Sequence, residues 1–145
     1  MKRFLITGAL LLLGTVAVKA GDDKPINVNE LPAKAKELIE KHFSNVKVSY
    51  AKVDKEIFDT TYEVIFVNGN KVEFAKNGDW KEVNCKYSQV PKGIVPQPIV
   101  SYISTNHQNL HVVEIDRDKR NIEVKLNNGL ELKFDLSYNL IDIDS

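Results

Sequence analysis

The sequence contains the same pattern of residues twice. Residues 62–83 read YEVIFVNGNKVEFAKNGDWKEV, and residues 122–143 read IEVKLNNGLELKFDLSYNLIDI. Aligned without a gap, the two segments share Glu, Val, Asn-Gly and Phe at equivalent positions, and apolar residues meet apolar residues at further positions such as Trp80 and Leu140. A repeated supersecondary unit constrains the fold strongly, because both copies must form the same elements and pack together to bury their apolar faces.

Each copy is predicted to be one helix followed by four strands. In the first copy, apolar residues recur at spacings of three and four over residues 31–43, which is typical of an amphipathic helix. The apolar spacing then changes to two, which predicts strands at residues 46–51, 57–67, 71–75 and 80–86. Asn68-Gly69 and Asn77-Gly78 predict tight turns, because both residue types tolerate positive φ. The polar residues 21–27 are expected to form a loose lead-in.

The second copy follows the same order with less regular spacing. Pro96 and Pro98 limit how early its helix can begin, so we expect a short helix over about residues 97–105. Residues 116–120 are charged and are expected to form a turn. The predicted strands of this copy are residues 110–115, 122–126, 130–136 and 140–143.

The predicted fold class is α+β. Two tandem helix-plus-four-strand repeats would form one antiparallel sheet of about eight strands, with both helices packed on one face. Repeat 1 covers about residues 26–87 and repeat 2 about residues 88–145, within a single domain of residues 21–145. The period of two places these side chains on the opposite, open face: Glu63, Ile65, Val67, Lys71, Glu73, Glu123, Lys125, Glu131, Lys133 and Asp135.

Residues 1–20 have the anatomy of a secretory signal peptide. Lys2-Arg3 precedes a mostly apolar run, and Val18-Lys19-Ala20 provides a cleavage site before Gly21. We therefore expect an exported protein, periplasmic or secreted, with no transmembrane span after cleavage. Removing the three basic residues of this leader from 20 Lys and Arg leaves 17 against 20 Asp and Glu, and no basic cluster is present. This charge balance argues against nucleic acid as a partner.

The mature chain resembles the PepSY-like family of small exported bacterial proteins, whose fold is also described as β-lactamase-inhibitor-like. The residues that carry the resemblance are LPAKAKELIEKHF (31–43), YEVIFVNGNKVEF (62–74) and NGDWKEVNC (77–85), with a looser second copy in NIEVKLNNGLELKFD and LIDID. The resemblance implies a single sheet backed by two helices, an open concave surface on the other side, and a binding or inhibitory role in the cell envelope.

The sequence offers no residue set that identifies a reaction, and we predict a protein that is not an enzyme and holds no cofactor or metal. His107 and His111 have the spacing of two metal ligands on one helix face, but a third ligand is not evident. Cys85 alternates with Val83 and is expected to be a small buried thiol, not a nucleophile. Residues 116–120 differ from a calcium-binding loop, because Arg120 occupies a ligand position.

Surface recognition is the function that these observations favour. We predict a non-catalytic exported binding or inhibitor-like module that recognises a protein, peptide or envelope component through the open sheet face. The alternative is a small-ligand or metal carrier in the periplasm, and both a monomer and a homodimer are compatible with the pattern. The candidate binding residues, which are aromatic side chains or apolar residues opposite the core, are Ile65, Val67, Tyr50, Tyr62, Trp80 and Tyr138.

Overall fold

The computed structural model describes residues 23–145, so the predicted signal peptide at residues 1–20 lies outside the described part of the chain. The first half contains a 3₁₀ turn (Val28–Glu30) and one α-helix, α2 (Ala33–His42). Its strands are β1 (Asp23–Ile26), β2 (Val48–Glu56), β3 (Asp59–Phe66), β4 (Lys71–Ala75) and β5 (Trp80–Asn84). The second half contains α3 (Gln97–Asn106), β6 (Val112–Arg117), β7 (Asn121–Leu126), β8 (Glu131–Asp135) and β9 (Leu140–Asp144).

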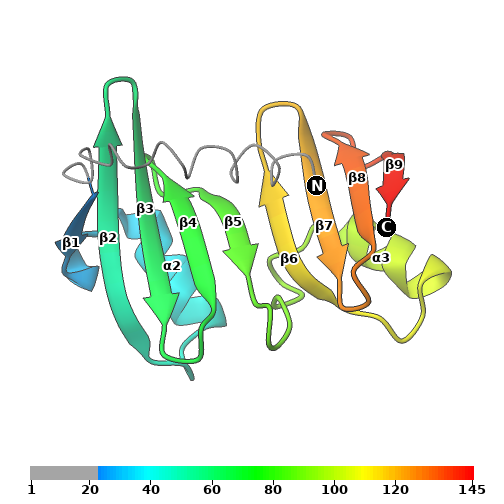
Figure 1. Ribbon diagram of the computed structural model, residues 1–145, viewed down its shortest axis with the longest axis horizontal. Coiled ribbons are helices and arrows are strands. Elements are labelled where there is room, and N and C mark those ends of the chain that lie inside the picture. The colour runs from blue at the N-terminus through cyan, green and yellow to red at the C-terminus, as the bar shows by residue number, and fades with distance from the viewer. Residues whose placement is uncertain (1–22) are drawn as a thin grey trace, which may run out of the picture.

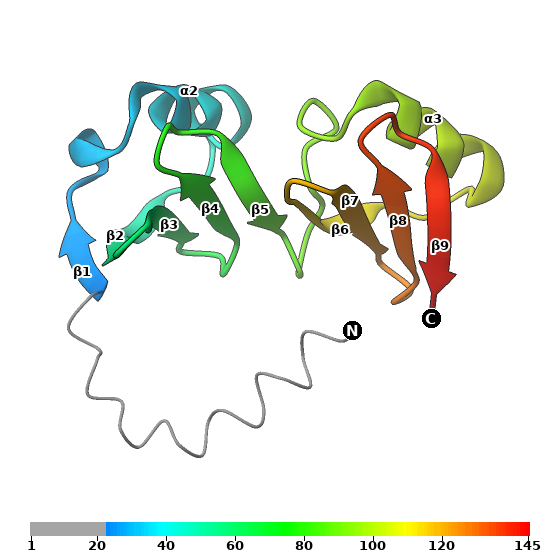
Figure 2. The same cartoon turned by 90° about the horizontal axis from the view of Figure 1, so that it is seen from above.

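The strands form one antiparallel sheet in which each strand pairs with the next along the chain, in the order β1 to β9 (Figure 1). Both helices lie on the same side of this sheet, as the view in Figure 2 shows. The α+β class, the single antiparallel sheet and the placement of two helices on one face are therefore confirmed. The sheet has nine strands, however, and not about eight.

The additional strand is β1, in the segment for which the sequence predicted a loose lead-in. Its residues pair with β2 from Asp23 opposite Asp54 to Ile26 opposite Ala51. The lead-in prediction was wrong because a short polar segment can still satisfy the free backbone groups along the edge of β2. Pro25 is compatible with this position because β1 is itself an edge strand, where one missing N–H is tolerated.

Two further boundaries differ from the prediction. Ile57 and Phe58 form the turn between β2 and β3, although the sequence placed them in a strand, and their side chains are almost fully exposed. The turn contains neither Asn nor Gly, so the usual hairpin signal is missing. Asp116 was expected in a turn, but it pairs with Glu82 and Glu123 inside β6.

The core lies between the helices and one face of the sheet. α2 contributes Ala35 and Ile39, and α3 contributes Ile99 and Ile103, each at most 9% exposed. The Phe43 ring stacks on Phe66 with 4.9 Å between the ring centroids. These contacts confirm the helix faces that the apolar spacing predicted, because the residues three and four apart are the ones that are buried.

Equivalent positions of the two aligned segments have equivalent partners in the sheet. Tyr62 pairs with Phe74, and Ile122 pairs with Phe134. The register also shifts at the same place in each half, next to Phe74 and next to Phe134. Gly69 and Gly129, which close the two hairpins, both have φ of 93°. The β3–β5 and β7–β9 segments are thus built in the same way.

Candidate functional site on the open sheet face

Charged side chains cover the sheet face that the helices leave open. In the printed registers, one line of cross-strand partners crosses β3 to β7 and consists of carboxylates only. We call this line the acidic row, and its members are Glu63, Glu73, Glu82, Asp116 and Glu123. Like charges on directly opposite strand positions repel one another, so the row costs folding free energy unless cations or protons offset the repulsion.

Lysines from neighbouring positions offset much of this charge at the ends of the row. Lys52 Nζ lies 3.1 Å from Glu63 Oε1, and Lys71 Nζ lies 3.3 Å from Glu63 and 3.6 Å from Glu73. At the other end, Lys133 Nζ lies 3.8 Å from Glu123 Oε2. These pairs are half-exposed, and each contributes little to stability by itself. The middle of the row lies on β5 and β6, where Lys71 also acts on Glu82.

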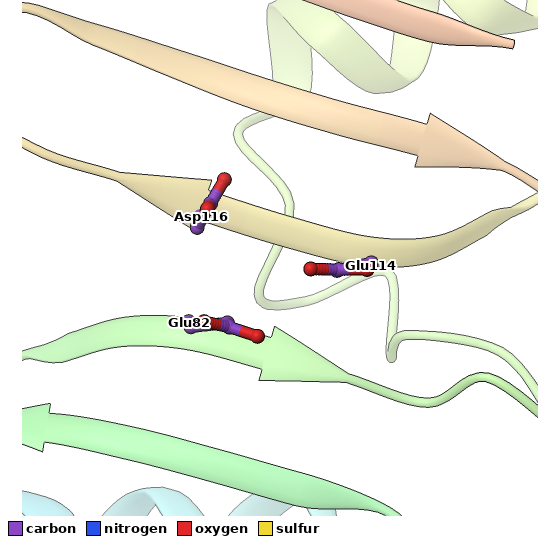
Figure 3. A group of neighbouring side chains, drawn as sticks. All are labelled: Glu82, Glu114 and Asp116. Carbon is purple, nitrogen blue, oxygen red and sulfur yellow. The ribbon is translucent and has the colours of Figure 1, made fainter. Parts of the chain in front are cut away.

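Three carboxylates gather at this point, and we call them the acidic cluster: Glu82, Glu114 and Asp116. One oxygen from each lies within 4.8 Å of the others, and all three residues are half-buried. Figure 3 shows Glu82 on β5 next to Glu114 and Asp116 on the adjacent strand β6. The cluster exists because β5 pairs with β6, so that Glu82 lies opposite Asp116 and Asn84 opposite Glu114.

Burial and repulsion alter the protonation of the cluster. Burial raises the pKa of Glu82, Lys71 lowers it, and the carboxylates of Glu73, Glu114 and Asp116 raise it, so that together they bring this pKa to about 7. A carboxyl group that is costly to ionise is one to which a cation or a hydrogen-bond acceptor can bind favourably. A hollow of about 210 Å³ lies beside the cluster, bordered by Glu82 and Asp116 and by the adjoining residues Asp118 and Asn121.

Arg117 of β6 lies on the helix side of the sheet, because its cross-strand partner is the buried Ile122. Its Nε donates a hydrogen bond to the backbone oxygen of Trp80 at 2.9 Å, and its guanidinium lies over the indole ring, 3.7 Å from the ring centroid. Trp80 itself is 8% exposed and belongs to the core cluster. The sequence did not determine which face Trp80 joins, and the structure places it in the core with a cation over its ring.

The structure does not bring the six candidate binding residues together in one patch. Tyr50 and Ile65 are cross-strand partners on the open face, and Tyr50 is 50% exposed. Tyr62, like Trp80, packs against the core. Val67 follows the end of β3 and is exposed, and Tyr138 lies in the β8–β9 turn with φ of 70°. Tyr50 and Ile65 therefore remain the pair that the open face presents.

Cys85 and Asp118 were also considered for chemistry, and the structure shows what surrounds each of them. Cys85 is completely buried, as the strand pattern predicted, and burial raises the pKa of its thiol to about 11. Such a thiol stays protonated at neutral pH and is a poor nucleophile. Asp118 Oδ1 accepts hydrogen bonds from the backbone N–H groups of Arg120 and Asn121, so it closes the β6–β7 turn.

His107 and His111 lie at the end of α3 and at the start of the following strand segment, where both border a second hollow. Among residues 23–145, the acidic cluster is the only group of three or more His, Cys, Asp or Glu side chains close enough to share one ion. The two histidines thus have no third ligand of these types in the described chain. Sequence reasoning missed Glu82 and Glu114, because only the pairing of β5 with β6 brings them together.

No helix among residues 23–145 is both long and apolar enough to cross a bilayer. The fold and its open sheet face define a class of small α+β proteins, in which helices back one side of a single broad sheet. The family described as "Putative beta-lactamase-inhibitor-like, PepSY-like" matches residues 60–142, more than half of the chain. The protein belongs to this PepSY-like family, as the helix and strand motifs predicted.

Solved structures from Bacteroides species are similar over most of the chain. A "putative calcium-regulated periplasmic protein" from Bacteroides thetaiotaomicron is 52% identical, with a TM-score of 0.85 over 87% of this chain and 99% of the other. A "putative periplasmic protein" from Bacteroides vulgatus is also 52% identical, with a TM-score of 0.84 over 86% and 98%. A second Bacteroides vulgatus protein, "of unknown function", is 38% identical, with a TM-score of 0.80 over 85% and 99%. No curated protein matches the chain.

Proposed function

We propose that this protein is a non-catalytic, exported module of the periplasm that binds a protein, peptide or other envelope component across its open sheet face. The observation that carries the proposal is that both helices of residues 23–145 cover the same face of the nine-stranded sheet. The predicted signal peptide, the periplasmic description of the similar structures and the inhibitor-like description of the family all support it. A tandem repeat, in which two equal units merge into one sheet, explains how a short chain acquires such a broad face.

Tyr50 and Ile65 are the best candidates for the apolar centre of this contact. They are cross-strand partners, Tyr50 is half-exposed, and Lys71 pairs with Ile65 on the next strand. An aromatic side chain loses little conformational entropy when it binds, and a surrounding rim of charge selects partners with complementary charge. The carboxylates of the acidic row favour a partner that presents lysines or arginines to β5 and β6.

Site-specific photocrosslinking in the native host tests which face is in contact with a partner. A photoreactive phenylalanine analogue would replace Ile65 on the open face or, as a matched control, Lys36 on the helix side of the molecule. We expect a discrete adduct from position 65 that disappears when Tyr50 is also changed to Asp, and no such adduct from position 36. Equal adducts from both positions, or none from position 65, would remove the open face from the proposal.

A second candidate function is a calcium response at the acidic cluster, favoured by the three converging carboxylates and by the description of the 52% identical neighbour as calcium-regulated. Calcium binds oxygen ligands at about 2.4 Å, so two ligands of one ion lie at most about 4.8 Å apart. The oxygens of Glu82, Glu114 and Asp116 meet this condition. Three carboxylates supply only part of the six to eight oxygens that calcium takes, so water would complete the shell and the affinity would be low.

Thermal unfolding in calcium tests this second function. With a dissociation constant of about 1 mM, 10 mM calcium would stabilise the folded protein by about 1.4 kcal/mol and raise Tm by about 3–6 °C. Magnesium should raise Tm less, because it requires stricter geometry and holds its water more firmly. Glu82→Gln should abolish the calcium effect, whereas Glu131→Gln, on the same face but outside the cluster, should retain it. An equal rise in both variants would show that calcium acts elsewhere.

A further inference from the structure

A hollow of about 430 Å³ lies on the helix side of the second half, where α3 ends and the chain turns towards β6. Three segments border it: residues 89–95, the C-terminal half of α3, and residues 108–112. A backbone hydrogen bond of 2.8 Å from Val90 N–H to Val112 O holds the first and third of these segments together. Volumes of this size are typical of small-molecule sites in proteins.

The walls of this hollow combine apolar side chains with an unsatisfied nitrogen. Val95, Val100 and Ile103 provide an apolar surface. His107 also borders the hollow, and its Nε2 is buried without a hydrogen-bond partner among the residues that the structure describes. A buried polar atom of this kind is uncommon in a native fold, because its lost hydration is normally replaced by a hydrogen bond. A rotation of the imidazole would bring Nε2 to the hollow, where a ligand could supply that bond.

The charge of the lining selects the sign of such a ligand. Lys92, His107 and His111 all border the hollow, and no Asp or Glu is among its lining residues. This composition contrasts with the open sheet face, where the acidic row concentrates negative charge. One ammonium group and two imidazoles suit a singly charged carboxylate, whereas a phosphate group is usually held by arginine or by several backbone N–H groups.

We propose that this hollow binds a small organic carboxylate with an apolar body. The carboxylate contacts Lys92 and, once the imidazole has rotated towards the hollow, accepts a hydrogen bond from His107 Nε2, while the apolar body packs against Val95, Val100 and Ile103. The volume corresponds to about 14 water molecules at ~30 Å³ each, so the ligand has about a dozen non-hydrogen atoms. This site is separate from the open face, and its test does not depend on the function proposed for that face.

Three probes with the same eight-carbon chain separate the contribution of the head group from that of the apolar body: octanoate, octan-1-ol and octylamine. Each would be titrated into isotopically labelled protein of residues 21–145 while backbone amide shifts are recorded by NMR. We expect octanoate to bind with a dissociation constant of about 1 mM or below. Its shifts should concentrate at residues 89–95 and 103–112, and octylamine should bind at least about tenfold more weakly.

Variants at the edge of the hollow provide the controls. Ser104→Phe places a large ring in the hollow from an exposed position of α3 and should abolish octanoate binding, whereas Ser101→Phe, three residues earlier on the same helix and outside the lining, should not. Lys92→Glu should weaken octanoate and strengthen octylamine. His107→Phe should weaken octanoate while leaving octan-1-ol unchanged, because it removes the nitrogen and keeps a ring of similar size.

The proposal is overturned if octanoate causes no saturable shifts up to 10 mM, on the order of tenfold above the expected dissociation constant. It also fails if octanoate and octylamine bind equally, or if Ser101→Phe and Ser104→Phe have the same effect. Loss of the native spectrum in His107→Phe would not rescue it, since the comparison of the two serine variants decides the location and Lys92→Glu decides the charge. Failure here leaves the photocrosslinking result at Ile65 unaffected.

Discussion

Glu82 is the side chain on which burial and like charge act together. It lies in the middle of the acidic row, opposite Glu73 on one side and Asp116 on the other. Burial and the neighbouring carboxylates together raise its pKa from 4.5 to about 7, against the opposing effect of Lys71. The folded protein therefore binds a proton at Glu82 more tightly than the unfolded chain does.

The sign of the resulting pH dependence follows from this difference. The stability contributed by protonated Glu82 is fully present below pH 4.5 and is lost as the pH rises through about 7. Without calcium, Glu82→Gln should therefore raise the free energy of unfolding by about 1–2 kcal/mol at pH 8 and change it much less at pH 5. This change is smaller than the pKa shift alone would give, because the side chain is partly hydrated and Lys71 is near.

Urea unfolding at pH 5 and pH 8 in the presence of a calcium chelator measures this effect. Glu37→Gln, at an exposed position of α2, is a control that should change stability by no more than about 0.5 kcal/mol at either pH. If Glu82→Gln is equally neutral at pH 8, the repulsion within the acidic cluster is relieved in another way. The same measurement with calcium added links this prediction to the proposed calcium response.

Residue chemistry also determined which parts of the site could be predicted from the sequence. The strand period predicted that Glu63, Lys71 and Glu123 share the open face, and the registers confirm it. The acidic cluster could not be predicted in the same way, because a local pattern does not specify which strand of one half pairs with which strand of the other. Asp116 was in addition assigned to a turn, since residues 116–120 are all charged.

Among the secondary-structure elements, periodicity and Asn-Gly turns predicted most of the structure. The helices were predicted because apolar spacing and prolines mark their faces and starts. The hairpins at Gly69 and Gly129 were predicted because positive φ favours glycine there. β1 was not, because DKPI has a single strand former, Ile26, next to a proline, and its order depends on pairing with β2. Tertiary contact, not local preference, determines such elements.

The turn between β4 and β5 shows how an element is held by another that is distant in sequence. Gly78 in this turn has φ of 95°, and a Cβ added there would lie 2.8 Å from Lys34 Cβ and 3.0 Å from Pro32 Cβ, at the start of α2. Lys34 Nζ also pairs with Asp79 at 3.0 Å. The turn therefore packs directly under the first turn of α2.

Gly78 and Gly129 form a matched pair for testing this contact. Both have positive φ, but a Cβ at Gly129 would meet nothing within 4 Å. Gly129→Ala should thus show only the backbone strain, about 1 kcal/mol, while Gly78→Ala should lose about 1–2 kcal/mol more because α2 must shift. Chemical denaturation of both variants gives the difference directly. Equal losses would mean that the start of α2 yields without cost.

In the whole molecule, the two halves meet at the pairing of β5 with β6. Three register pairs join these strands, among them Val83 with Ile115, and Cys85 N–H continues the contact to Val113 O at 2.7 Å. Buried residues from both sides of this junction belong to one hydrophobic cluster that includes Val83, Ile115 and Trp80. Arg117 of β6 lies over the ring of Trp80 at the start of β5 and strengthens the junction. The two halves should therefore unfold as one cooperative unit.

Trp80 is the single tryptophan of the chain, so its fluorescence reports on the first half and on the contact with Arg117 at the junction. Leu132 is fully buried in the second half, on β8, and Val72 is its counterpart on β4. Leu132→Ala should lower stability by about 2–4 kcal/mol through loss of buried surface and the cavity left behind. Because the junction couples the halves, the unfolding transitions seen by Trp80 fluorescence and by circular dichroism should both move to lower denaturant, and by the same amount. The same agreement between the two signals is expected for Val72→Ala.

A Trp80 transition that stays in place while the circular dichroism transition becomes biphasic would show that the two halves unfold separately although their strands form one sheet. The open face would then be two adjoining surfaces, each able to lose its structure without the other.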